Sequence, residues 1–115
     1  IVQAFLPHLR RAETPRVAVV SSSLGSMQTE GSTNIAYRAA KAALNKITQG
    51  LAIDLKKEGI AVVALNPGWV RTDMGGKSAE LSVEESASGL VATLDALRLE
   101  DTGRFLDWRN EETPW

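Results

Sequence analysis

Hydrophobic positions follow two different periods along the chain, and their alternation predicts the order of the elements. Three segments repeat apolar side chains at helical spacing: 1–9, about 36–58, and 82–98. Three short apolar runs lie between or after them: 17–20, 60–66 and 104–108. Continuous apolar runs of this length are typical of buried strands in a parallel sheet. The order helix, strand, helix, strand, helix, strand therefore predicts an α/β fold with a doubly wound parallel sheet.

Local signals sharpen this outline. The run that begins at Val17 is rich in β-branched residues, so we expect this strand to be buried on both faces. Gly59 fits the end of the second helix. Ser82 and Glu85 have the spacing of a capping box, which predicts the start of the third helix. The second helix is apolar nearly all round, so one side is expected to cover the sheet and the other is free for a second subunit.

Composition and charge narrow the class of partner. The chain has 43% hydrophobic and 23% charged residues, as a globular protein does, and its net charge of −1 offers no basic excess for nucleic acid or an anionic membrane. No apolar stretch approaches the roughly 20 residues of a membrane span. The absence of cysteine excludes disulfides and thiolate metal sites, and fits the cytoplasm. We expect a small-molecule partner, no nucleic acid, no membrane and no metal.

Tyr37 and Lys41 lie four residues apart in the second predicted helix. Side chains at this spacing share one face of a helix, with their Cβ atoms roughly 5–6 Å apart. A phenol has a reference pKa of about 10, and an ammonium group fixed beside it favours the phenolate. The pair fits a general acid/base that exchanges a proton with a carbonyl or alcohol oxygen. The same spacing also fits an ordinary solvated helix face.

Polar and turn-forming residues follow the first two predicted strands. Serines 21–23 end the first strand, and Pro67-Gly68 and then Thr72 follow the second. Ligands of a parallel α/β sheet bind at the carboxyl ends of its strands. A serine there can reach the same oxygen as Tyr37. Taken singly, each stretch fits a loop start, a turn or a helix cap equally well.

Together these stretches resemble the second half of a short-chain dehydrogenase/reductase. The motifs are "VVSSSLG", "YRAAK" and "NPGWVRT". The further stretches "NPGWVRTDMGG", "SVEESASGL" and "TGRFLDW" are similar to the subgroup close to the C-signalling factor. The resemblance implies that residues 1–115 form the C-terminal half of a Rossmann-type sheet, a partial NAD(P)-binding domain whose N-terminal half is absent. It also implies a homodimer or homotetramer, since family members associate through the tyrosine helix and the helix before it.

The resemblance also assigns roles to single residues. Tyr37 would be the general acid/base, and Lys41 would favour its phenolate and hold the nicotinamide ribose hydroxyls. Ser22 matches the family's catalytic serine, although an alignment shift of one residue would point to Ser21 or Ser23 instead. The residues expected to bind the cofactor are Tyr37, Lys41, Pro67, Gly68, Val70 and Thr72. Trp69 is expected either to line the substrate pocket or to be a buried structural residue.

The family's glycine-rich dinucleotide fingerprint and its catalytic asparagine have no counterpart in this chain. We therefore expect a fragment of an NAD(P)-dependent oxidoreductase that interconverts a carbonyl and an alcohol, inactive and poorly folded by itself. The choice between NAD and NADP and the substrate are not readable. A non-catalytic binding or signalling protein of the same fold, and a truncated remnant, are the alternatives.

Overall fold

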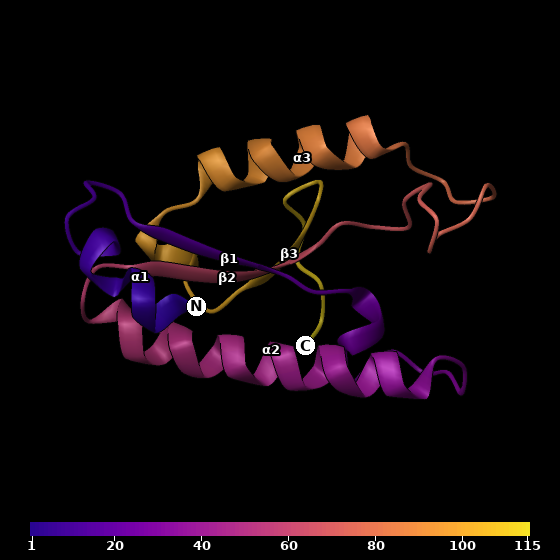
Figure 1. Ribbon diagram of the computed structural model, residues 1–115, viewed down its shortest axis with the longest axis horizontal. Coiled ribbons are helices and arrows are strands. Elements are labelled where there is room, and N and C mark those ends of the chain that lie inside the picture. Colours follow the sequence, from indigo (N-terminus) through magenta and orange to yellow (C-terminus); the bar gives the residue numbers. More distant parts are fainter.

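A three-stranded parallel sheet lies between helices on both of its faces, as Figure 1 shows. The computed structural model describes residues 1–115. The helices are α1 (Val2–Leu9), α2 (Ile35–Lys56) and α3 (Val83–Ala96), and the strands are β1 (Arg16–Val20), β2 (Ala61–Asn66) and β3 (Phe105–Asp107). The predicted α/β class and the predicted order of elements are confirmed. None of the three helices combines the length and apolar character that crossing a bilayer requires.

The core has two halves, one on each face of the central strand β2. Neighbouring side chains on a strand point to opposite faces. Val62 packs with Ala52 and Leu55 of α2, together with apolar residues of α1. Val63 and Leu65 instead pack with Leu97 and with apolar residues of α3. Thus α1 and α2 cover one face and α3 covers the other (Figure 1), which is the layering of a doubly wound sheet.

The first strand is covered on both faces, since Val17 packs on the side of α1 and α2 and Ala18 on the side of α3, but it is less deeply buried than expected. The strand order is β1-β2-β3, so β1 lies at the edge and pairs only with β2. Its residues are half-buried, and Val20 is 52% exposed. By contrast, the first five residues of β2 are all buried. The sequence of β1 is that of an interior strand, whereas its position in this sheet is that of an edge.

The ends of the helices follow their sequence signals closely. Beyond α2, the N–H of Gly59 donates to the carbonyl of Lys56, and the N–H of Ile60 donates to that of Leu55, the two bonds of a Schellman motif. Gly59 has the positive φ of 74° that this motif needs. Before α3, Ser82 Oγ accepts from Glu85 N at 3.1 Å, and Ser82 N donates to Glu85 Oε2 at 2.8 Å. This bond to the Ser82 N–H lowers the pKa of the Glu85 carboxyl below its ordinary value.

Two short 3₁₀ turns were not predicted. One, Ser23–Gly25, directly follows the serines at the end of β1, and the other, Leu99–Asp101, follows α3. α3 ends at Ala96, two residues before the expected end, because Leu97 has an extended backbone. The first of these turns fixes where the side chains of the serines at the end of β1 point.

Candidate functional site

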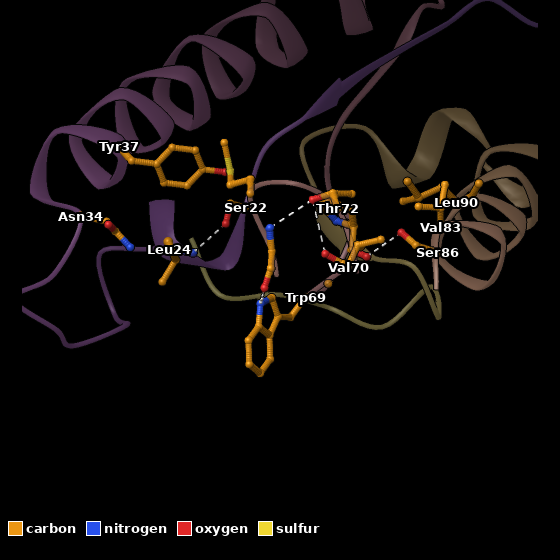
Figure 2. Close-up of a pocket in the computed structure, with 15 residues that line it drawn as sticks. Ser22, Leu24, Asn34, Tyr37, Trp69, Val70, Thr72, Val83, Ser86 and Leu90 are labelled. Atoms are coloured by element: carbon orange, nitrogen blue, oxygen red, sulfur yellow. Dashed lines mark hydrogen bonds between the residues drawn. The ribbon is translucent and has the colours of Figure 1, made fainter. Parts of the chain in front are cut away.

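A cavity of about 690 Å³ opens where the carboxyl ends of β1 and β2 meet the first turn of α2 (Figure 2). α3 and the segment after β2 close its other side. The lining residues are Ser22, Leu24, Asn34, Tyr37, Pro67, Gly68, Trp69, Val70, Thr72, Met74, Gly75, Val83, Ser86, Ala87 and Leu90. Segments far apart in the sequence thus meet at the edge of the sheet where parallel α/β proteins bind ligands.

The three consecutive serines have different environments. Ser21 is buried, and its hydroxyl donates to Asn45 Oδ1 at 2.5 Å. Ser22 lines the cavity, and its Oγ accepts from the backbone N–H of Leu24 at 3.2 Å. Because this bond uses an oxygen lone pair, the hydroxyl hydrogen of Ser22 remains available to a ligand. Of the three serines, only Ser22 belongs to the cavity lining.

Asn45 of α2, which the sequence reading did not single out, holds the serine turn against the helix. Its Oδ1 accepts from Ser21, and its Nδ2 donates to the carbonyl of Gly25 at 3.2 Å. Asn45 is buried with both ends of its amide hydrogen-bonded. A polar residue at a core-facing position of an apolar helix was the available signal, since buried amides need partners.

Tyr37 and Lys41 lie close together, one turn apart on α2. Tyr37 lines the cavity, and Lys41 Nζ lies 5.6 Å from the centroid of its ring. Lys41 itself is not part of the lining, and its ammonium donates to the carbonyl of Val20 at 3.1 Å, at the end of β1. This bond fixes the cation beside the phenol, within the range of a cation–π contact.

The wall opposite the serine turn follows β2. Its predicted residues Pro67, Gly68, Val70 and Thr72 all line the cavity. Gly68 has a φ of 78°, and a Cβ there would lie 2.6 Å from Leu81 Cδ1, so the sharp turn requires glycine.

Two hydroxyl groups stabilise this wall. Thr72 Oγ1 accepts from Gly75 N at 3.1 Å and donates to Val70 O at 3.4 Å. Ser86 of α3, absent from the sequence prediction, is buried and donates from its Oγ to the carbonyl of Pro67 at 2.7 Å. The helix is thereby tied to the turn after β2. Nothing in the local sequence of α3 distinguishes Ser86 from an ordinary helix serine.

Trp69 lines the cavity and is 52% exposed, so the alternative of a buried structural tryptophan is wrong. Its Nε1 donates to the carbonyl of Gly75 at 2.9 Å. Asn34, which precedes α2 with a left-handed φ of 56°, also lines the cavity and was not predicted. An asparagine just before a helix is a common capping residue, and here it makes no side-chain cap.

The cavity is lined without a single charged side chain. Its polar groups are mostly hydroxyls, set among aliphatic and aromatic side chains. Such a lining suits an uncharged ligand with a polar oxygen, since apolar walls supply burial and the hydroxyls supply direction. Lys41, outside the lining, has its ammonium 5.6 Å from the centroid of the Tyr37 ring.

Comparison with known proteins identifies the family. A profile described as short chain dehydrogenase matches residues 1–82, which include the serine turn, Tyr37, Lys41 and the turn after β2. The chain belongs to the short-chain dehydrogenase family. The resemblance inferred from the motifs is therefore confirmed. Among curated relatives, C-signal of Myxococcus xanthus is 44% identical over the whole chain, which covers 70% of that protein.

Solved structures give the same family. An NADPH-bound carbonyl reductase from chicken fatty liver superposes with a TM-score of 0.89 at 37% identity, covering 98% of this chain and 50% of the reductase. The carbonyl reductase Sniffer of D. melanogaster gives a TM-score of 0.87 at 38% identity, covering 99% of this chain and 51% of Sniffer. The chain thus spans about half the length of these reductases.

Proposed function

We propose that the chain is the C-terminal, catalytic half of an NAD(P)-dependent reductase that interconverts a carbonyl and an alcohol. The observation that carries the proposal is the meeting of Ser22 and Tyr37 in one uncharged cavity, with the ammonium of Lys41 fixed beside the tyrosine. The likeness to carbonyl reductases supports the same reaction class. On this proposal residues 1–115 are part of a Rossmann-type domain completed by a further N-terminal segment.

The proposed chemistry gives each side chain a distinct task. The Ser22 hydroxyl donates a hydrogen bond to the substrate carbonyl oxygen and orients it. Tyr37 gives its phenolic proton to that oxygen as the alcohol forms, and removes it in the reverse direction. Lys41 stabilises the negative charge that Tyr37 acquires when it gives up the proton. The nicotinamide cofactor, when bound, supplies or accepts the hydride.

The residues present fit the nicotinamide end of such a cofactor. The wall after β2 offers apolar side chains at Pro67 and Val70 and a hydroxyl at Thr72, which suits a ring that carries a carboxamide. Lys41 is close enough to Tyr37 to reach a ribose hydroxyl beside it. NAD and NADP both fit these residues, because the two cofactors differ only at the distant adenosine ribose.

The partners proposed for the complete protein are a small carbonyl or alcohol compound and a second copy of the chain. We propose a homodimer or homotetramer acting in the cytoplasm, without nucleic acid or membrane. One exposed stripe of α2 supports the self-association, since its residues are all apolar: Ala36, Ala40, Ala43 and Ile47. Solvent-facing apolar stripes of this kind mark interaction sites.

The test uses the complete protein with NADH and NADPH against a panel of aldehydes and ketones. We expect reductase activity in the parent, and a fall of roughly 10²- to 10⁴-fold in kcat for Tyr37→Phe, which loses only the acid/base hydroxyl. Ser22→Ala is expected to lose activity as well, whereas Ser88→Ala, at an exposed position of α3, keeps it. Cofactor binding, followed by NAD(P)H fluorescence, should persist in Tyr37→Phe. A Tyr37→Phe protein as active as the parent would rule out the proposed role.

A non-catalytic binding or signalling protein of the same fold is the second candidate. The observation that favours it is the similarity to a protein named C-signal rather than after a reaction. The same assay separates the two. A parent protein that binds NAD(P)H but reduces no carbonyl compound would favour the binding protein, and one that binds neither cofactor would favour a truncated remnant.

A further inference from the structure

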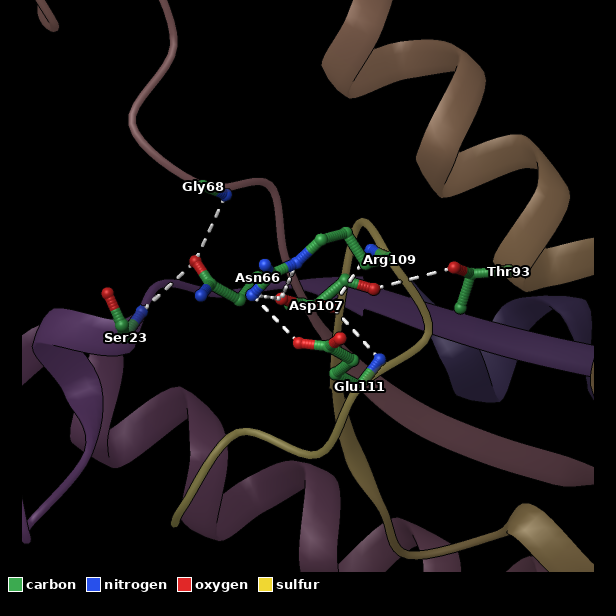
Figure 3. Close-up of polar contacts among 7 residues, drawn as sticks. All are labelled: Ser23, Asn66, Gly68, Thr93, Asp107, Arg109 and Glu111. Atoms are coloured by element: carbon green, nitrogen blue, oxygen red, sulfur yellow. Dashed lines mark hydrogen bonds and ion pairs between the residues drawn. The ribbon is translucent and has the colours of Figure 1, made fainter. Parts of the chain in front are cut away.

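The side chain of Asn66, the last residue of β2, links the two walls of the cavity (Figure 3). Its Oδ1 accepts from the backbone N–H of Ser23 at 3.3 Å and from that of Gly68 at 3.2 Å. The first N–H belongs to the serine turn and the second to the turn after β2. One amide oxygen therefore binds both turns, although Asn66 does not itself line the cavity.

The orientation of this amide is fixed by its partners. Backbone N–H groups only donate, so the atom that faces both of them must be the carbonyl oxygen and not the NH₂ group. An oxygen with two lone pairs can accept both bonds at once. The shorter side chain of a serine would not reach both donors. An alkyl group of similar size to the amide could accept neither hydrogen bond.

The backbone of Asn66 is held in place by its neighbours, so the position of its side-chain oxygen is well defined. Its backbone pairs with Asp107 of β3, and the Asp107 carboxylate accepts from the backbone N–H groups of Arg109 and Glu111 at 2.8 and 3.0 Å. The carbonyl of Asp107 also accepts from Thr93 Oγ1 of α3 at 3.4 Å. Figure 3 shows these contacts gathered beside Asn66. The strand end beneath the side chain is thus held by bonds that do not involve its amide.

We propose that Asn66 is a positioning residue that sets Ser22 relative to the Pro67-Gly68 wall. The inference rests on the proposed reductase function. The N–H of Ser23 belongs to the peptide group that joins it to Ser22, so holding that peptide also fixes the Ser22 backbone. The N–H of Gly68 belongs to the Pro67–Gly68 peptide, at the wall assigned to the nicotinamide. Asn66 therefore fixes the position of Ser22, which orients the substrate carbonyl, relative to the Pro67-Gly68 wall, which positions the cofactor.

The test is a double-mutant cycle in the complete protein, with kcat/KM measured for the best carbonyl substrate. Asn66→Leu has a similar size but no acceptor, and we expect a loss of roughly 10- to 100-fold, the cost of a misplaced catalytic group. Added to Ser22→Ala, the same change should cost only about twofold, because the residue through which Asn66 acts is already gone. A merely structural role would make the two losses multiply. Asn66→Asp keeps an acceptor oxygen and should lose less than Asn66→Leu.

A second readout does not depend on activity. Backbone hydrogen exchange, measured by NMR without substrate, should accelerate at both Ser23 and Gly68 in Asn66→Leu by about fivefold, the effect expected of one lost hydrogen bond. Multiplying losses in the cycle, unchanged exchange at both amides, or an Asn66→Asp protein as weak as Asn66→Leu would each overturn the proposal. A parent protein without reductase activity would instead refute the proposed function, and the exchange rates alone would then decide whether Asn66 links the two turns.

Discussion

Gly25 allows the serine turn to touch the backbone of α2 directly. A Cβ at this position would lie 2.7 Å from Lys41 Cβ and 2.8 Å from the Lys41 carbonyl carbon, closer than real side chains approach. Neither neighbour is a flexible side-chain end, so one of the two elements would have to move. Gly25 thus fixes the distance between Ser22 and the helix that carries Tyr37 and Lys41.

We predict that Gly25→Ala destabilises the complete protein by about 1–3 kcal/mol, the usual cost of overpacking. Activity should fall further than stability alone explains, because the serine turn moves away from Tyr37. Urea unfolding and kcat/KM of the same preparation measure the two effects. Gly50→Ala, within α2 and with nothing near its added Cβ, is the control and should stabilise the helix by up to about 1 kcal/mol. Equal behaviour of the two variants would refute the close-contact explanation.

The choice among the three serines shows how far residue-level prediction reached. The sequence placed a serine at the end of the first strand and left Ser21 and Ser23 open beside Ser22. The serines differ in their hydrogen-bond partners in the folded chain. Ser21 bonds to Asn45, 24 residues further along, and the N–H of Ser23 bonds to Asn66, 43 residues further along. Hydrogen bonds over such separations follow from the assembled sheet and not from local pattern. The same reason explains why Asn34, Ser86 and the bond from Lys41 to Val20 were not foreseen.

At the scale of elements, α2 has two tasks on its two sides. Its inner side carries Tyr37 and Lys41 at one end and packs Ala52 and Leu55 against the sheet at the other. Its outer side is exposed although apolar, and Ile47 there is 59% exposed. A helix that is apolar on both sides is buried on both, so the outer side is expected to be covered in the complete assembly.

We predict that Ala43→Glu, in the middle of the exposed stripe of α2, dissociates the proposed dimer, because the charge would be buried without a partner at the interface. Light scattering of the complete protein should show the molar mass falling by half, or from tetramer to a smaller species. Ala92→Glu, at an exposed position of α3, adds the same charge elsewhere and is the control. An unchanged mass for Ala43→Glu, or a monomeric parent, would contradict the prediction.

Strands and helices were predictable because their signals are local. The capping box before α3 and the glycine stop after α2 depend on residues three to five positions apart. The burial of β1 was not predictable, because it depends on which strand lies beside it. The 3₁₀ turn Ser23–Gly25 was missed for a related reason, since a run of small polar residues fits many loop conformations.

At the scale of the whole molecule, the 115 residues form a small core and a less compact shape than is usual for this length. Only 21 of them are buried, and the two clusters of the core contain four buried residues each. The radius of gyration is 14.5 Å, whereas a compact domain of this length has about 13 Å. Phe5 and Val20, on α1 and β1, are both more than half exposed. The free edge of β1 is open to pairing with another strand.

We predict that residues 1–115 expressed alone do not form a cooperative, active unit. The exposed β1 edge and the small core favour association or a loosely packed state over a unique fold. Near-UV circular dichroism should show no sharp thermal transition, the dye ANS should bind, and NAD(P)H fluorescence should not change on addition of the chain. Adding the N-terminal half as a separate chain supplies a partner for the edge, and it should restore both a thermal transition and cofactor binding. A soluble 115-residue protein that melts cooperatively and binds NAD(P)H would show that this half of the sheet is sufficient by itself.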